Sequence, residues 1–401
     1  MKKTLAAVAV LGAFAGSALA ADVQLYGIVD TGLRYTHFDA DTSRANFNYD
    51  ATDSFEMKSG QQSGSRFGFK GTEDLGNGLT VGFILENQFD SDTGALKNKD
   101  SFFHREASLF LEGGFGKIAM GRMGSINGGT SSWGKYGVMS AFGTSWDYSA
   151  QAGSWAIGGG QWDNMVAYET PSFAGFKVFA QYGMGSNNFE NESGSDRYYA
   201  IGASYANGPL NLYFAVDSIN YKSWDGKKAT DTDDSLTVTL GGNYDFEVVK
   251  VFAGAQYFDE IKLSKMGCGL SLVGTDEFNS YYTTGTAGNE EDPLVEHTGY
   301  ANAFKGWSLG LSASIPVAGG NVLVGAAYLD AEAADSVAKE MANDEMSRWI
   351  VSAGYDYPLS KRTNVYGILT YAQDSLEYTD AADKDQDPTI FAAMVGIRHK
   401  F

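Results

Sequence analysis

The stretch GSRFGFKGTEDLGNGLTVGFILENQF, residues 64–89, decides the fold, because it contains two alternating segments joined by a glycine-rich turn. The apolar side chains at every second position are Phe67, Phe69, Leu79, Val81, Phe83, Leu85 and Phe89. The positions between them include Arg66, Lys70, Glu86 and Gln88. Alternation with period two predicts strands whose two faces meet different surroundings. One face requires an apolar solvent and the other requires water.

The first twenty residues, MKKTLAAVAVLGAFAGSALA, have the pattern of a secretory signal peptide. Two lysines precede an apolar run, and Ala18-Leu19-Ala20 supplies a small-residue cleavage site. We therefore expect residues 1–20 to be removed on export and residues 21–401 to form a single barrel domain. Beyond the signal no run of 18 apolar residues occurs, so we expect no membrane-spanning helix. The net charge of −20 argues against nucleic acid as a partner.

The same alternation recurs along the whole chain, and we count sixteen such segments. Seven short turns connect them, at residues 74–78, 113–116, 172–175, 207–209, 245–248, 318–321 and 358–362. Long polar connections lie between the turns, among them residues 124–161, 222–234, 261–305 and 331–345. This alternation of short and long connections predicts an all-β fold: a transmembrane antiparallel barrel of sixteen strands, with short periplasmic turns and long extracellular loops. Sixteen strands favour an open aqueous lumen.

Several blocks of sequence resemble the general diffusion porins of beta-proteobacteria and their neisserial relatives. They are SRFGFKGTEDLGNGL, REASLFLEGGFGKIAMGR, YETPSFAGF, YPLSKRTNVYG and the ending GIRHKF, in that order. The resemblance implies a homotrimer in the cell outer membrane, in which each barrel is a pore for small ions and hydrophilic solutes. It also implies that the third long loop folds into the pore. The final strand resembles the signal that the barrel-assembly machinery recognises, which assigns Ile397, His399 and Phe401 to assembly.

Charged side chains at the narrowest level of a pore select ions. By alternation, Asp30, Arg34, Arg66, Lys70 and Glu86 face the lumen. Lumen charges often pair, so an ion pair of Arg66 with Glu86 is the competing interpretation of Arg66.

The resemblance adds Arg105 to the basic cluster, and Arg122 is a further candidate for the pore wall. Strict alternation aims both of these arginines toward lipid, so a bulge or a strand end must intervene if they line the pore. Asp147 is the one acid in the central part of the presumed inward loop. Many relatives carry a further arginine where this chain has Ala167. Because basic residues outnumber acids here, we expect a weak preference for anions.

The presumed inward loop is aromatic, with Trp133, Trp146, Trp155 and Trp162. Two interpretations of these rings are open. They could stack on sugars, which would make the protein a substrate-selective porin, or they could pack the loop against the barrel wall. A barrel acting as an adhesin or structural anchor is a third alternative, and it predicts a plugged lumen.

Small outward residues at Gly27, Ala107 and Ala119 suit subunit contact, and the acidic outer loops suit divalent cations shared with lipopolysaccharide. The four histidines form no catalytic or metal-binding motif with neighbouring residues. We therefore expect no enzyme activity, no cofactor and no metal site.

Overall fold

The computed structural model describes most of the barrel wall and part of its connections. The described residues are 22–39, 52–129, 131–143, 146, 155, 160–185, 196–221, 233–262, 303–336, 345–377, 387 and 389–401. The expected signal peptide and Asp147 lie outside these residues. Among the described residues, no helix is long and apolar enough to cross a membrane.

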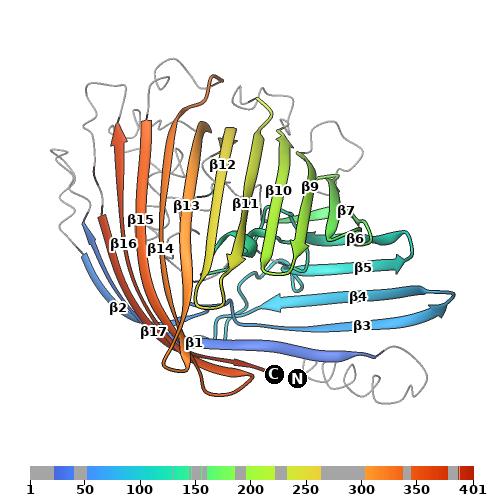
Figure 1. Ribbon diagram of the computed structural model, residues 1–401, viewed down its shortest axis with the longest axis horizontal. Coiled ribbons are helices and arrows are strands. Elements are labelled where there is room, and N and C mark those ends of the chain that lie inside the picture. The colour runs from blue at the N-terminus through green and yellow to red at the C-terminus, as the bar shows by residue number, and fades with distance from the viewer. Residues whose placement is uncertain are drawn as a thin grey trace.

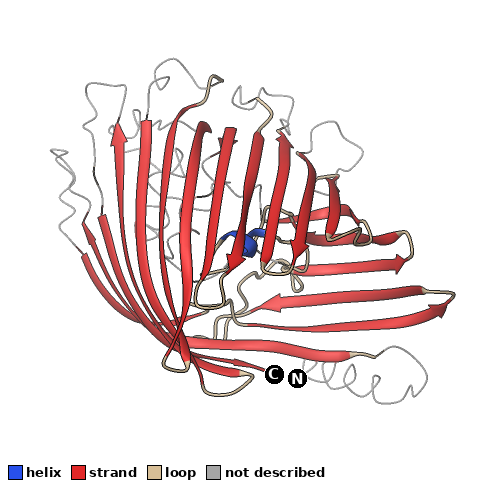
Figure 2. Cartoon of the chain, in the orientation of Figure 1, coloured by secondary structure: helices blue, strands red, loops and turns tan. Residues whose placement is uncertain are grey.

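Seventeen strands form one antiparallel sheet that closes on itself (Figures 1 and 2). They are β1 (Gln24–Asp39), β2 (Thr52–Ser59), β3 (Arg66–Gly76), β4 (Leu79–Gln88), β5 (Glu106–Gly113), β6 (Gly116–Gly124), β7 (Gln161–Glu169), β8 (Phe176–Gly183), β9 (Arg197–Asn207), β10 (Leu210–Asn220), β11 (Leu236–Asp245), β12 (Lys250–Lys262), β13 (Ala303–Val317), β14 (Gly320–Ala333), β15 (Glu345–Pro358), β16 (Thr363–Glu377) and β17 (Thr389–Lys400). Pairing of β1 with β17 closes the barrel, with Val29 opposite His399.

The wall contains sixteen strands, because β2 and β3 are two halves of one. Both pair with β1: β2 opposite residues 31–38 and β3 opposite residues 24–28. Residues 60–65 between them leave the ladder, and we call them the strand-break segment. The expected sixteen-strand barrel is therefore confirmed, while the break was not foreseen from the alternation.

Short turns join the strands at one end of the barrel, and the strand ends that the longer connections link lie at the other end (Figure 1). In the turn between β3 and β4, Gly76, Asn77 and Gly78 all have positive φ angles, of 81°, 53° and 77°. Glycine and asparagine adopt this left-handed conformation most readily, which is why the sequence LGNG reverses the chain tightly here.

The two faces of the wall differ as the alternation predicts. On β5, Leu109 is 59% exposed on the outer face, whereas its neighbour Ser108 is 5% exposed on the inner face. The prediction that Ala119 faces outward is wrong, because this residue is only 1% exposed and belongs to the packed interior. It has the parity opposite to Ile118 and Met120, so it cannot contribute to a subunit interface.

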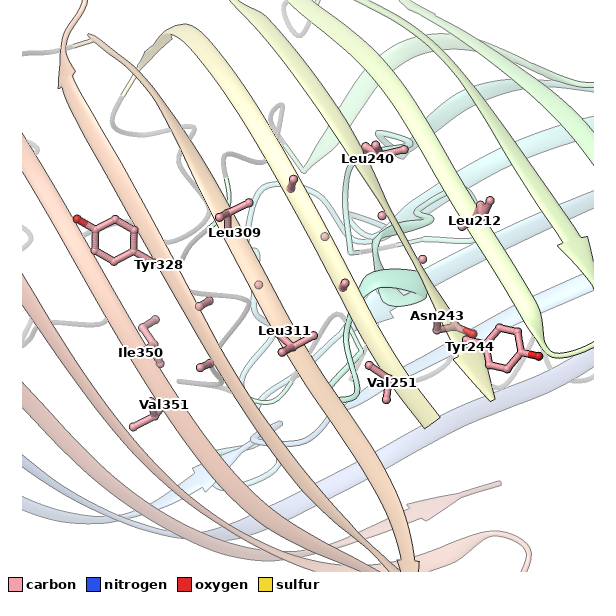
Figure 3. Close-up of a pocket in the computed structure, with 18 of the residues that line it drawn as sticks. Leu212, Leu240, Asn243, Tyr244, Val251, Leu309, Leu311, Tyr328, Ile350 and Val351 are labelled. Atoms are coloured by element: carbon pink, nitrogen blue, oxygen red, sulfur yellow. The ribbon is translucent and has the colours of Figure 1, made fainter. Parts of the chain in front are cut away.

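The outer face is apolar and carries rings near both ends. Trp307 packs with Tyr328, and Trp349 with Tyr371, towards the end with long connections. Tyr244 and Phe246 pack near the short turns. A shallow groove of about 1100 Å³ between these levels is lined by Leu212, Leu240, Leu309, Leu311 and Val351, among others (Figure 3). Such an apolar band between aromatic levels is typical of a lipid-facing barrel surface.

Candidate pore constriction

The connection between β6 and β7, residues 125–160, is called the inward loop, because its described residues (125–129, 131–143, 146, 155 and 160) include side chains buried against the inner faces of the wall. Its 3-10 turn, η1 (Tyr136–Met139), lies behind the front strands in Figure 2. Trp133, Tyr136, Met139 and Trp155 are buried in an apolar cluster against the inner faces of β5 to β10. Phe142 and Trp146 are buried in a second cluster with residues of β14, β16 and β17. The loop therefore spans the lumen from one wall to the other.

Polar contacts fix the loop at several points along this path. The Asn127 side chain donates to Asp217 on β10, with 2.5 Å between Nδ2 and Oδ2. Asn243 on β11 donates to the carbonyl of Val138 at 2.7 Å. The backbone N–H of Ala141 donates to Ser312 on β13 at 2.9 Å. These bonds to β10, β11 and β13 hold the loop across the barrel rather than above it.

The tryptophans of this region serve packing. Trp133, Trp146, Trp155 and Trp162 are 3%, 5%, 0% and 4% exposed. Trp155 meets the Tyr136 ring edge-on at a centroid distance of 5.5 Å. A ring that stacks on a passing sugar must present a free face, and these rings do not. The geometry therefore favours the wedge interpretation over the sugar-stacking one.

A glycine on β12 allows this wedge to sit against the wall. A Cβ at Gly254 would lie 2.8 Å from the Trp155 ring. We expect Gly254→Ala to lower the free energy of unfolding of the barrel by about 1–3 kcal/mol, the usual cost of overpacking. Heat-induced loss of the folded, fast-migrating form in detergent electrophoresis would measure it.

Gly367 on β16 is the matched control, because a Cβ there meets only ordinary contacts at 3.6 Å. Equal stability of Gly254→Ala and the native protein would contradict the wedge interpretation.

A cavity of about 750 Å³ remains open beside the inward loop. Its charged lining residues come from four strands and from the loop. The cations are Arg66, Lys70, Arg105, Lys135 and Lys400. The carboxylates are Glu86 and Glu106. Five positive and two negative groups give this lining an excess of three positive charges.

Glu86 on β4 is the centre of the charge network. Its Oε1 accepts from Arg105 Nε at 2.6 Å, and its Oε2 accepts from the Tyr26 hydroxyl at 3.0 Å. Arg66 Nε lies 3.8 Å from Oε2. The carboxylate therefore neutralises part of the basic wall and holds two guanidinium groups in place.

The family resemblance places Arg105 in the pore, whereas strict alternation aims it at lipid, and its position in the structure explains the difference. It lies one residue before β5, so strand parity does not govern its side chain. Its guanidinium is 6% exposed and reaches Glu86 and Gln88, which face inward on β4. Its position at a strand end is one of the two arrangements that the sequence left open.

Two further charged groups of the cavity, Glu106 and Lys135, are tied to the inward loop and its surroundings. The Glu106 carboxylate accepts from the backbone N–H and the hydroxyl of Ser132, each at 2.8 Å. Lys135 Nζ lies 3.6 Å from Glu169 on β7. Burial lowers the pKa of the Lys135 amine, and the Glu169 carboxylate opposes that shift. Glu106 and Lys400 have inward parity on their strands, so alternation was the signal that would have identified them as lining residues.

Three of the expected pore residues, Asp30, Arg34 and Arg122, do not line this cavity. Asp30 is fully buried and binds the strand-break segment. Arg34 pairs with Glu56 on β2 at 2.5 Å. Arg122 lies opposite Ala107, which faces outward, and its guanidinium contacts Asp163 at 2.5 Å and the His104 carbonyl. Asp147 lies outside the described residues.

The end of the chain closes the barrel. The backbones of Gly27 and Phe401 exchange two hydrogen bonds of 3.1 Å. A Cβ at Gly27 would lie 2.3 Å from the Phe401 ring, so this glycine makes room for the terminal ring. Ile397 is exposed on the outer face. His399 Nδ1 lies 2.8 Å from the Thr363 hydroxyl. No group of three or more His, Cys, Asp or Glu side chains suited to a metal occurs among the described residues.

Comparison with known proteins agrees with this architecture. The sequence model of a family described as Gram-negative porin matches residues 6–376. The chain is 32% identical to an outer membrane porin protein of Bordetella pertussis over 424 residues, and 30% identical to outer membrane porin protein 32 of Delftia acidovorans over 421 residues. Each alignment covers 100% of both chains.

The fold is also similar to that of solved porins. The anion-selective porin from Comamonas acidovorans has a TM-score of 0.63 and 25% identity, and the match covers 95% of this chain and 100% of that one. With a closed sixteen-strand wall, a loop across the lumen and these relatives, the chain belongs to the Gram-negative porin family and forms an outer-membrane channel for passive diffusion of small hydrophilic solutes and ions.

Proposed function

We propose that diffusion through this channel favours anions. The observation that carries the proposal is the excess of three positive charges among the residues that line the open cavity. The similar porin from Comamonas acidovorans is anion-selective, which supports the same direction. The strongly negative total charge of the chain does not oppose it, because charges beyond a Debye length of roughly 8–10 Å are screened.

The carboxylates of the cavity offer little to a passing cation. Glu86 is already bonded to Arg105 and Tyr26, and Glu106 is bonded to the inward loop. Both residues are buried. Lys70, by contrast, has an exposed side chain whose nearest ring contact is Tyr26, 5.2 Å from Nζ. An anion entering the cavity therefore meets accessible cations, whereas a cation meets carboxylates whose oxygens are occupied.

Arg66→Ser removes one of these cations and should shift selectivity toward cations. A unit charge about 7 Å from an ion changes its energy by about 0.6 kcal/mol in water, or roughly threefold in population. Because chloride and potassium respond in opposite directions, we expect their permeability ratio to fall about three- to sevenfold. The reversal potential of a planar bilayer under a KCl gradient measures this ratio.

Lys361→Ser is the control for this change, since it removes the same charge from an exposed short turn between β15 and β16. We expect it to leave the ratio unchanged. If Arg66→Ser and Lys361→Ser gave the same reversal potential, Arg66 would not belong to the ion filter, and its ion pair with Glu86 would be its whole role.

We further propose that the protein is a homotrimer, assembled through the barrel-assembly machinery by its terminal strand and set among outer-membrane lipid and lipopolysaccharide. We also keep the proposal that residues 1–20 are a cleaved signal and that the remainder is one domain. The family and the relatives above are channels rather than enzymes, which supports the expectation that this chain is not an enzyme. Stepwise insertion with three conductance sublevels would support the trimer, and single steps without sublevels would contradict it.

A further inference from the structure

We infer that the strand-break segment, residues 60–65, is a second constriction element of the pore, and that Gln62 in it positions Trp146 of the inward loop, the residue we call the loop tip. The segment departs from the wall into the barrel. Gln61, Gln62, Ser63 and Ser65 are all buried there. Gly60 has a φ angle of 74°, a conformation that glycine adopts without strain and that turns the chain out of β2.

Asp30 on β1 holds the segment in its inward position. Its Oδ2 accepts from the backbone N–H groups of Gln62 and Ser63, at 2.8 and 2.6 Å. Its Oδ1 accepts from the Tyr366 hydroxyl on β16 at 2.5 Å. The Ser65 hydroxyl donates to the Asp30 carbonyl at 3.0 Å. A buried carboxylate with this many donors fixes the backbone of the segment, and it accounts for the inward acid that alternation placed at residue 30.

The Gln62 side chain ties the same segment to the neighbouring wall. Its Nε2 donates to Asp356 Oδ2 on β15 at 3.1 Å. Its Oε1 accepts from Asn364 Nδ2 on β16 at 2.7 Å. Both ends of the amide are therefore used, and the residue has one orientation that satisfies them.

The backbone of Gln62 receives the tip of the inward loop. The Trp146 N–H donates to the Gln62 carbonyl at 3.2 Å. The Trp146 ring packs edge-on against Tyr366 at a centroid distance of 5.3 Å, and the hydroxyl of Tyr366 binds Asp30. Asp30, Gln62, Trp146 and Tyr366 thus form a closed ring of contacts. Gln62 and Trp146 therefore pack against the inner faces of β14 to β17, and the open basic cavity is lined by β1, β3, β4, β5, the inward loop and the C-terminal end of β17.

The width of the open cavity therefore depends on the Gln62 side chain, although this side chain does not line the cavity. The selectivity residues Arg66, Lys70 and Arg105 line the cavity, whereas Gln62 does not. Loosening Gln62 should therefore change conductance without changing the permeability ratio. A residue that contributed only to the stability of the fold would change neither property in an assembled, open channel.

The test is single-channel recording of Gln62→Ala, which removes both side-chain bonds and keeps the carbonyl that Trp146 uses. At a typical net value for each hydrogen bond, losing two raises the population of a displaced loop tip by about tenfold or more. We expect excursions to a larger conductance level to occupy about ten times more of the open time, with an unchanged reversal potential under a KCl gradient.

Gln256→Ala is the control, because this buried glutamine on β12 donates to the Thr239 hydroxyl at 2.9 Å, outside the ring of contacts that Asp30, Gln62, Trp146 and Tyr366 form. The proposal is overturned if both alanine variants behave alike, or if Gln62→Ala conducts as the native protein does. If Gln62→Ala fails to assemble, Tyr366→Phe provides the test instead. This variant keeps the aromatic ring that packs against Trp146 and removes the hydrogen bond to Asp30. It should produce the same excursions at lower frequency, and their absence would refute the ring of contacts.

Discussion

Replacing Lys70 and Lys400 together by glutamate should invert the ion preference of the channel. Both lysines line the open cavity. The double change lowers the charge of the lining by four units, from an excess of three positive charges to one negative charge. At about three- to sevenfold per unit charge, four units should lower the chloride-to-potassium permeability ratio by roughly eightyfold or more. The reversal potential under a KCl gradient should then change sign.

The control for this inversion is Lys99→Glu with Lys361→Glu, the same change of four units at two exposed residues outside the cavity lining. It should leave the sign of the reversal potential as in the native protein. Salt gives a second check, because screening shortens the reach of each charge. The inversion should weaken as the KCl concentration is raised. A preference for anions that survived the change of Lys70 and Lys400 would contradict the proposed filter.

Glu86→Ala should cause the largest loss of stability among single changes at the constriction. Arg105 and Arg66 would be left close together with Glu86 no longer between them, and Arg105 is buried. Removing one partner of a buried ion pair typically costs about 3–5 kcal/mol, because the other charge stays buried without compensation. The unfolding temperature of the barrel, followed by the electrophoretic mobility shift, should fall accordingly. Any assembled channel should prefer anions more than the native one.

Glu86→Gln separates the two effects. The amide oxygen still accepts from Arg105 and the side-chain volume is nearly unchanged, so we expect a smaller loss of stability. The charge lost is the same, so the gain in anion preference should equal that of Glu86→Ala. If Glu86→Ala were as stable as the native barrel, the network around Glu86 would not support the constriction.

The predicted effects distinguish the residues that line the cavity from the residues that hold its lining or the inward loop in place. Lys70 and Lys400 act through charge that an ion meets directly. Glu86 acts both through charge and by holding Arg105. Gln62 acts through the position of the inward loop alone. Measurements of permeability ratio, stability and open-channel conductance therefore distinguish the three kinds of residue.

The sequence by itself determined the wall of this protein. Alternation with period two is a property of the local backbone, since successive side chains of a strand point to opposite faces. It was therefore enough to predict the sixteen strands, the short turns at one end, and the inward direction of Arg66, Lys70 and Glu86. The outward assignment of Ala119 was wrong because it departed from this alternation: Ala119 has the parity opposite to the outward-facing Ile118 and Met120.

The tertiary structure alone decided what the inward side chains do. Asp30 meets Tyr366, and Gln62 meets Trp146, only because the barrel closes and the loop between β6 and β7 crosses it. Those partners are far apart in the chain, and no local period encodes which of them meet. Arg105 lies at a strand end, where alternation no longer applies, so its direction is set by Glu86 and Gln88. Local geometry therefore specified the wall, and long-range closure specified the constriction.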